Sequence, residues 1–164
     1  MKRYKVFSAV FPIIMKEEGG KRYVLLHKRQ NTGYMDGKWD IAGSGHIEEN
    51  ETAVDAVIRE SREEIGITVH RDKVKFALVS HKAGLHGTKT YFDVYFWIEQ
   101  YQGEPRIREP EKSSALLWHD ADDLPSDMIE ERKADLIWAL RGEHYREIYQ
   151  MEDDSRPCGQ QAAN

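Results

Sequence analysis

Residues 52–65 repeat apolar side chains at the spacing of an α-helix, and this segment constrains the fold more than any other. Projected at about 100° per residue, one face of that helix carries Val54, Val57, Ile58, Ser61 and Ile65. Thr52 and Asp55 form a capping-box-like start, and Gly66 stands where a C-terminal glycine cap belongs. The sequence therefore predicts one amphipathic helix whose apolar face must be covered by another layer.

Runs rich in β-branched and aromatic residues surround this helix and predict strands. They cover residues 4–15, Lys21–Arg29, Trp39–Ala42, Gly45–Glu48, Val74–Ser80, Thr90–Glu99 and Leu116–His119. Turn-forming residues predict surface loops over Asn31–Lys38 and Gly103–Ser114. Apolar residues return to helical spacing over Ser126–Tyr149, which predicts a long second helix on the other side of the sheet.

The length of 164 residues matches one domain with a tail, which we place at 1–150 and 151–164. The tail has almost nothing to bury and is expected to be disordered. Pro12 interrupts the apolar stretch near the N-terminus and no cleavage site follows, so we interpret residues 4–15 as a strand rather than a secretory signal. No apolar run is long enough to cross a bilayer, so no membrane partner is expected.

Charge and cysteine content narrow the possible functions. A net charge of -5 argues against a protein that coats nucleic acid, and small anionic substrates would need a cation. The single cysteine, Cys158, can form neither an internal disulfide nor a cysteine-based zinc site. A reducing cytoplasm is therefore the expected compartment.

Three glutamates gather on one flank of the predicted helix. Glu60 and Glu64 lie one turn apart with Glu63 beside them. Glu63 and Glu64 also lie in the last turn, where the helix dipole disfavours each negative charge by about 0.3 to 1 kcal/mol. Two interpretations fit this violation of a local rule. Either the flank is a solvated face whose acids are offset by Arg59 and Arg62, or the carboxylates bind a hard cation such as Mg²⁺.

The spacing of this segment resembles the Nudix box, which runs Gly, five residues, Glu, seven residues, then R-E-U-x-E-E-x-G-U with U bulky and apolar. The matching residues are Gly45, Glu51, Arg59, Glu60, Glu63, Glu64, Gly66 and Ile67. The departure from the pattern is Ser61, which occupies the first U position. A serine there should weaken a core contact and leave the chemistry intact. The chain is thus identified as similar to Nudix hydrolases.

That resemblance implies an α/β (α+β) fold, an α-β-α sandwich around a central mixed sheet. It also implies a Mg²⁺-dependent pyrophosphohydrolase, with Mn²⁺ as a possible substitute, in which water attacks phosphorus. By motif position, Glu60 and Glu64 are the main metal ligands and the backbone carbonyl of Ser44 is another. Glu63 is a further ligand or the base for the attacking water, and Arg59 orients a carboxylate.

Several residues outside the box are candidates for binding substrate. Glu109 and Glu111 are each either a solvated loop acid or the loop glutamate that completes the metal site in relatives, and His46 is either a phosphate contact or a plain hydrogen-bonding residue. Tyr34 and Trp118 are candidates for a base pocket. One face of the strand at 90–99 presents Tyr91, Asp93, Tyr95 and Trp97, which would either stack on and hydrogen-bond a base or form a second buried sheet face.

The expected partner is a small nucleotide or other diphosphate, bound by a monomer or homodimer. The alternative function is a nucleotide-binding regulator without turnover, which would be expected to have lost the acids that this box retains. An isopentenyl-diphosphate isomerase-like activity ranks lower, because that chemistry uses a cysteine in the core and the only cysteine here is in the tail. The substrate itself is not fixed by the box, since specificity comes from loops.

Overall fold

The computed structural model describes residues 3–85 and 89–149, and the expected tail at 151–164 lies outside them. The elements are β1 (Phe7–Glu18), β2 (Lys21–Arg29), β3 (Trp39–Ile41), β4 (Gly45–His46), α1 (Ala53–Ile65), a 3₁₀ turn (Arg71–Lys73), β5 (Val74–Leu85), β6 (Lys89–Ile98), β7 (Ser113–Asp120), α2 (Glu130–Leu140) and β8 (Tyr145–Tyr149). The predicted strands are all present, but several bounds differ: β1 and β5 extend past their expected ends, and β4 stops at His46. Strand β7 begins at Ser113, within the segment expected to be a loop, and ends at Asp120.

The strands form one mixed sheet in the order β3-β2-β1-β6-β5-β8, with β4 paired to β1 and β7 paired to β2. Strand β1 runs parallel to β6, and β5 runs parallel to β8, while the other pairs are antiparallel. On its second edge, β1 pairs with β4 at Ala9 and Val10 and with β2 at Met15–Glu18. Pro12 lies between these two pairings, so its missing N–H interrupts neither ladder.

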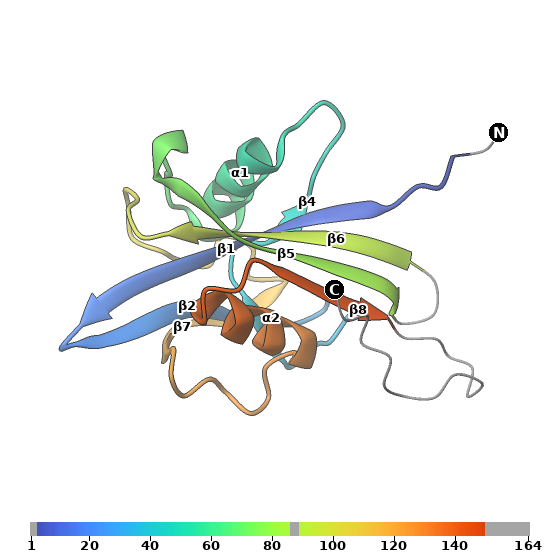
Figure 1. The fold of residues 1–164 in the computed structure, drawn as a ribbon. Helices are drawn as coiled ribbons and strands as arrows, with labels where there is room; N and C mark the ends of the chain where they lie inside the picture. The colour runs from blue at the N-terminus through green and yellow to red at the C-terminus, as the bar shows by residue number, and fades with distance from the viewer. Residues whose placement is uncertain (1–2, 86–88, 150–164) are drawn as a thin grey trace.

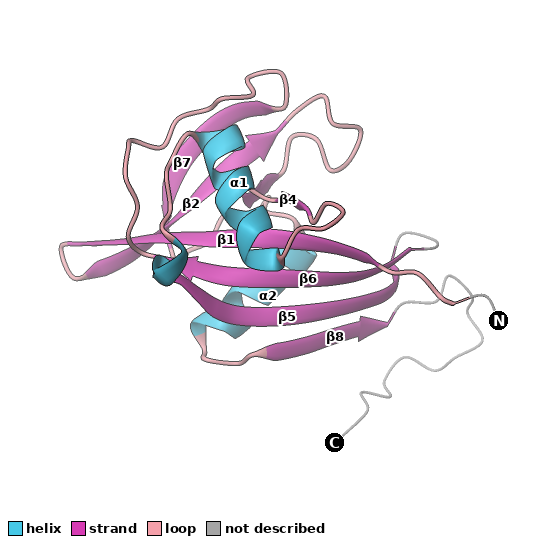
Figure 2. Cartoon of the chain, turned by 90° about the horizontal axis from the view of Figure 1, so that it is seen from above, coloured by secondary structure: helices cyan, strands magenta, loops and turns pink. Residues whose placement is uncertain are grey.

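Helices α1 and α2 cover opposite faces of the sheet (Figure 1, Figure 2). Under α1, Val57 and Ile65 pack with Val10, Ile14 and other strand residues. Under α2, Leu136 packs with a second cluster from the opposite face. The predicted α-β-α sandwich is therefore confirmed, and α2 closes it on the side opposite α1 as expected.

Helix α1 begins and ends where the sequence predicts. The Thr52 hydroxyl accepts a hydrogen bond from the Asp55 N–H at 3.2 Å, and Gly66 ends the helix in the left-handed region at φ 74°. Ser61 is buried at the position where the box pattern has a bulky apolar residue, and its hydroxyl has no hydrogen-bond partner among the described residues. The apolar face that fixes α1 on the sheet is otherwise complete.

The predicted helix over Ser126–Tyr149 is wrong in length. Helix α2 covers only Glu130–Leu140, and the chain then turns at Gly142, whose φ of 78° is left-handed. The segment after the turn forms β8, which pairs with the edge of β5. Ile148 therefore belongs to a strand, because a left-handed glycine and a run rich in aromatic residues favour an edge strand over a further helical turn.

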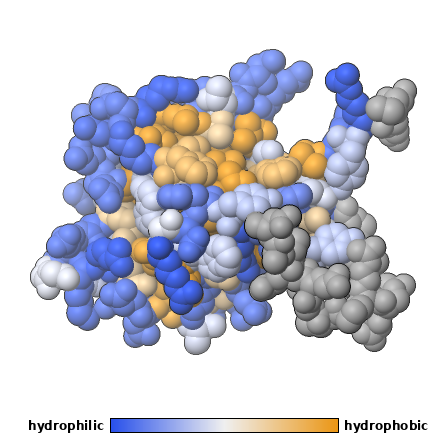
Figure 3. Space-filling view, in the orientation of Figure 1, coloured by the Kyte–Doolittle hydropathy of each residue, from blue (hydrophilic) through white to orange (hydrophobic). Residues whose placement is uncertain are grey.

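Hydrophilic residues cover most of the face shown in Figure 3, while hydrophobic residues gather toward the α1 side of the sheet. Within the described ranges, neither helix has the length and apolarity that a membrane span requires.

Candidate active site

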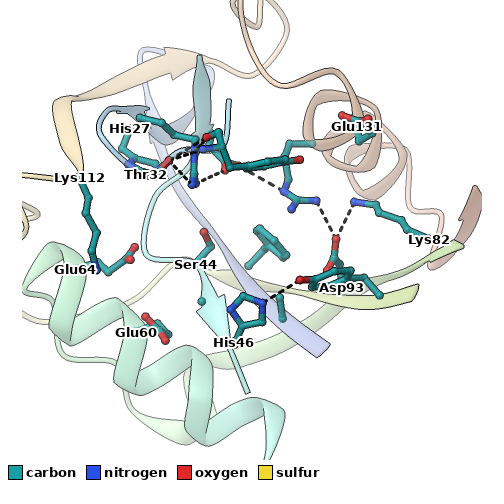
Figure 4. Close-up of a pocket in the computed structure, with 18 of the residues that line it drawn as sticks. His27, Thr32, Ser44, His46, Glu60, Glu64, Lys82, Asp93, Lys112 and Glu131 are labelled. Carbon is teal, nitrogen blue, oxygen red and sulfur yellow. Dashed lines mark hydrogen bonds and ion pairs between the residues drawn. The ribbon is translucent and has the colours of Figure 1, made fainter. Parts of the chain in front are cut away.

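A cavity of about 800 Å³ opens between α1, the loop at 31–38 and α2. Figure 4 shows Glu60 and Glu64 on one wall, Ser44 and His46 between, and Lys82 and Asp93 toward the other end. Residues selected from the sequence meet in this cavity: Tyr34, Ser44, Gly45, His46, Glu60, Glu64, Tyr91 and Asp93. Its volume falls in the range typical of small-molecule sites.

Arg59 organises the acidic wall. Its guanidinium donates to both carboxylate oxygens of Glu51 at 2.8 and 2.9 Å, to Glu60 at 2.7 Å and to the backbone carbonyl of His46 at 3.1 Å. The Glu51 hydrogen bonds, despite partial burial, hold the pKa of Arg59 well above its ordinary value. Arg59 thus ties α1 to the loop before it and fixes the carboxylate of Glu60.

Glu63 does not line this cavity and is half exposed. Its carboxylate accepts a hydrogen bond from Arg59 at 3.2 Å, with 49% of the side chain exposed. Neither Glu63 nor Arg59 lines the cavity directly. The structure therefore places Glu60 and Glu64 on the cavity wall and leaves Glu63 outside the cavity, paired with Arg59.

Glu60 and Glu64 stand in an environment that disfavours negative charge. Burial raises the pKa of Glu60, and Arg59 only partly opposes it. Burial, followed by repulsion from Glu60 and Glu109, raises the pKa of Glu64 to about 8. Within residues 3–85 and 89–149, no side chain forms an ion pair or hydrogen bond with the Glu64 carboxylate. Two neighbouring acids in this state form a site where a cation would relieve both desolvation and repulsion.

Gly45 makes room for this wall. A β-carbon built on Gly45 would overlap the carboxylate of Glu60, so any other residue there would displace this carboxylate from its position. Glu60, Glu64 and the carbonyl of the neighbouring Ser44 offer oxygen donors alone, the set preferred by Mg²⁺. As the side chains stand, no three histidine, cysteine or acidic residues of the described chain are close enough to hold a metal ion. The donor set therefore fits a divalent cation whose remaining ligands come from solvent and substrate phosphates.

The two loop glutamates have different surroundings. Glu109 pairs with Lys112 at 3.0 Å and lines a small cavity of about 20 Å³ together with Glu64. Lys112 also lines the main cavity (Figure 4). Glu111 is exposed and lines neither cavity. Glu109 is thus the loop acid that the structure brings to the acidic wall.

Of the two aromatic candidates for a base pocket, only Tyr34 lines the main cavity. Tyr34 lines the main cavity beside Arg29, whose guanidinium carbon lies 5.4 Å from the centre of its ring. Trp118 lies outside the cavity, packed against the α1-side core with the Lys16 ammonium 4.9 Å from its ring. His46 faces the cavity with its Nε2 atom 3.3 Å from the hydroxyl of Tyr91.

The face on β6 is divided between the core and the cavity, so the expected buried face is confirmed for two of its four residues. Tyr95 and Trp97 pack into the core on the α2 side, whereas Tyr91 and Asp93 line the cavity. Sequence patterns missed several polar residues of the cavity, among them Arg29, Asp40, Lys82 and Arg132, which come from four elements. Alternation along β6 was the one available signal, since it placed Asp93 on the same face as Tyr91.

A family model of the NUDIX domain matches residues 6–140, and the chain belongs to the Nudix family. It is 32% identical to the 8-oxo-dGTP diphosphatase of Escherichia coli strain K12 over 105 residues. The matched region covers 62% of this chain and 77% of that protein. An uncharacterised Nudix hydrolase of Bacillus subtilis, YvcI, is 34% identical over 88 residues, or 52% of this chain and 54% of the relative. The chain is therefore a Nudix hydrolase, as its box predicts.

Solved structures agree with the fold. The crystal structure of a MutT NUDIX hydrolase from Burkholderia pseudomallei superposes with a TM-score of 0.70 at 25% identity, covering 82% of this chain and 98% of that one. The NUDIX domain of Shewanella oneidensis NrtR, complexed with ADP ribose, gives a TM-score of 0.67 at 17% identity over 85% of this chain and 88% of that one.

Proposed function

We propose that this chain is a divalent-cation-dependent pyrophosphohydrolase that cleaves a nucleoside triphosphate or another nucleoside diphosphate-linked compound by attack of water on phosphorus. The observation that supports it most is the pair of Glu60 and Glu64, held on the wall of a cavity large enough for a nucleotide. The similarity to an 8-oxo-dGTP diphosphatase supports a nucleotide as substrate. Mg²⁺ is the cation we propose, with Mn²⁺ as a substitute.

Glu60, Glu64 and the Ser44 carbonyl would hold the cation. When bound, the cation would draw charge from the diphosphate and favour ionisation of the attacking water. Arg59 keeps Glu60 aimed at the cavity, and Gly45 leaves the space that this carboxylate occupies. Lys112, which also lines the cavity, supplies a positive charge next to Glu64 for a phosphate oxygen. Glu109 is the loop acid that would complete this wall.

Glu63 is our proposed base. A half-exposed ion pair contributes only about 0 to 1 kcal/mol, so Glu63 can leave Arg59 at small cost and turn toward the site. His46 and Tyr34 would contact the substrate along the cavity, His46 near the phosphates and Tyr34 near the base. Glu111 and Trp118 have no place in this proposal, since both lie outside the cavity. The single cysteine and the net charge of -5 support a cytoplasmic enzyme that does not act on nucleic acid.

The test is a screen of nucleoside triphosphates and nucleotide-linked diphosphates with Mg²⁺ or Mn²⁺, run in ¹⁸O-labelled water. We expect label on a phosphorus-containing product and a nucleoside monophosphate with pyrophosphate from a triphosphate. Full activity in excess chelator, or label in neither product, would contradict the proposal. Tight nucleotide binding without turnover would instead indicate a regulator, and conversion of an isoprenoid diphosphate to its isomer would indicate isomerase activity.

A pair of variants tests the acidic wall itself. Glu60→Gln should lower turnover at least about a hundredfold, because it removes a charged ligand while keeping the shape of the side chain. The matched control, Glu99→Gln, changes an exposed glutamate outside the cavity and should keep turnover within about twofold. Equal activity of the two variants would show that Glu60 has no role in catalysis.

A further inference from the structure

The end of the cavity away from Glu60 and Glu64 contains a cluster of buried charges (Figure 4). The Lys82 ammonium lies 2.8 Å from Oδ2 of Asp93 and 2.7 Å from Oδ2 of Asp135. Arg132 donates to the same Asp93 Oδ2 atom at 2.8 Å. Both carboxylates are buried, with side chains 1% and 0% exposed. Two cations therefore share one oxygen of Asp93.

The other oxygen of Asp93, Oδ1, is buried and accepts no hydrogen bond from any described residue. Leaving a buried charged acceptor unpaired is among the more expensive polar defects in a folded protein, and such exceptions need an explanation. Asp93 also lines the cavity. An acceptor that the fold leaves unpaired at a ligand cavity is suited to a donor brought by the ligand.

Asp135 shows what a purely structural acid in the same cluster looks like. Its Oδ1 accepts from Ser80 at 2.9 Å and from Arg146 at 2.6 Å. Its Oδ2 accepts from Tyr95 at 2.6 Å and contacts Lys82. Asp135 does not line the cavity. The fold thus satisfies both oxygens of the acid that faces the core and only one oxygen of the acid that faces the cavity.

We propose that Asp93 is a specificity-determining residue whose Oδ1 atom accepts a hydrogen bond from an N–H group on the nucleobase of the substrate. This inference rests on the proposed function and specifies which part of the substrate this end of the cavity binds. Lys82 and Arg132 fix the carboxylate through Oδ2, so Oδ1 has a defined position. The Arg132 guanidinium is itself held over the ring of Phe11, 4.1 Å from its centre.

The surroundings favour a base over an apolar group. Tyr34 lines the same cavity and offers an aromatic surface against which a planar ring can pack. An isoprenoid chain in this position would bring no donor and would leave the buried Asp93 Oδ1 unpaired, which is unfavourable. A nucleobase brings both the flat surface and the N–H group.

The first test uses the unmodified enzyme, so that folding of a variant is not at issue. With Mg²⁺ present, kcat/KM and calorimetric affinity are measured for the triphosphates of the common nucleosides, and then for analogues of the preferred base in which each N–H is methylated. One analogue should lose about 10- to 100-fold in kcat/KM and in affinity, as expected for a hydrogen bond to a charged group. Losses below twofold for every analogue would overturn the inference.

The calorimetric measurement separates this inference from the proposed function. A chain that binds nucleotides through one N–H but does not cleave them would contradict hydrolysis and support the role of Asp93. A chain that cleaves nucleotides without regard to any base N–H would support hydrolysis and contradict that role. A chain that neither binds nor cleaves nucleotides would overturn both.

The second test compares Asp93→Asn with Asp135→Asn. Lys82 and Arg132 require an acceptor, so the carbonyl of an asparagine at 93 takes the Oδ2 position and its NH₂ group replaces Oδ1. The preference for the N–H form of the base over its methylated analogue should then fall from about 10- to 100-fold to about twofold or less. Asp135→Asn disturbs the same Lys82 from outside the cavity and should keep that preference.

An equal loss of preference in both variants would show that the effect passes through the charge cluster and would overturn the assignment to Asp93. If Asp93→Asn does not fold, the analogue series on the unmodified enzyme decides the question alone.

Discussion

Binding of a divalent cation should release a proton from Glu64 at neutral pH. Burial is the main reason that the pKa of Glu64 is raised to about 8, and repulsion from Glu60 and Glu109 adds to it. A carboxylate must be ionised to ligate a metal, so the cation and the proton compete for the same group. The pH dependence of metal binding therefore reports directly on the electrostatics of the acidic wall.

The size of the effect follows from that pKa. At pH 7 about nine in ten molecules carry a proton on Glu64, so binding should release about 0.9 proton per cation. At about pH 9 release should fall to about 0.1 proton. Apparent affinity for Mg²⁺ should drop about tenfold for each pH unit below 8, as long as the other ligands stay ionised. Calorimetry in two buffers with different ionisation enthalpies measures the number of protons directly.

Two variants sharpen this test. Glu109→Gln removes one of the charges that raise the pKa of Glu64, so proton release at pH 7 should decrease. Glu64→Gln should abolish the release together with most of the affinity. A matched change of an exposed acid, Glu99→Gln, should alter neither. Binding at pH 7 without proton release, or unchanged release in Glu64→Gln, would refute the reasoning.

Three further predictions concern stability. Leu136→Ala should lower the free energy of unfolding by about 2 to 5 kcal/mol in denaturant titrations, whereas Leu117→Ala, at a side chain 53% exposed, should stay within about 0.5 kcal/mol. Arg59→Ala should cost about 1 to 3 kcal/mol, since it leaves Glu51 and Glu60 without their main partner, and an unchanged melting temperature would contradict this. The metal-free protein should lose stability as pH rises from about 4.5 to about 8, because Glu64 keeps its proton in the folded protein and loses it in the unfolded chain. Glu64→Gln should reduce this dependence of the unfolding free energy on pH.

The acidic wall could be predicted from the sequence because its determinants are local. The cap at Thr52, the glycine at 66 and the apolar spacing all lie within one helix, and they agree on its ends. Helical periodicity then puts Glu60 and Glu64 on one flank whatever the rest of the chain does. The position of the Glu63 carboxylate could not be predicted in the same way, because a long side chain can reach several alternative partners. Here it accepts a hydrogen bond from Arg59 in the preceding turn.

The polar end of the cavity could not be predicted because its residues come together only in the fold. Lys82 and Asp93 meet across the pairing of β5 with β6, and Arg132 reaches them from α2. Periodicity also predicted that the second helix includes Ile148, whereas α2 ends at Leu140. Periodicity alone cannot show that the chain turns at Gly142 and continues as an edge strand. Charged residues that would look solvated in a sequence are buried here because each finds an opposite charge from a distant segment.

Strand β1 links the two ends of the cavity. At Ala9 and Val10 it pairs with β4, which carries Gly45 beside the acidic wall. At the next residue, the ring of Phe11 supports Arg132 and so the cluster around Asp93. These positions of β1 also pair with β6, and all three side chains are buried. Packed strands of this kind resist deformation, so the spacing between the acidic wall and Asp93 is set by the sheet rather than by mobile loops. A substrate must therefore match both ends at once, and shortening or lengthening the link between its base and its phosphates should lower kcat/KM even when each part is unchanged.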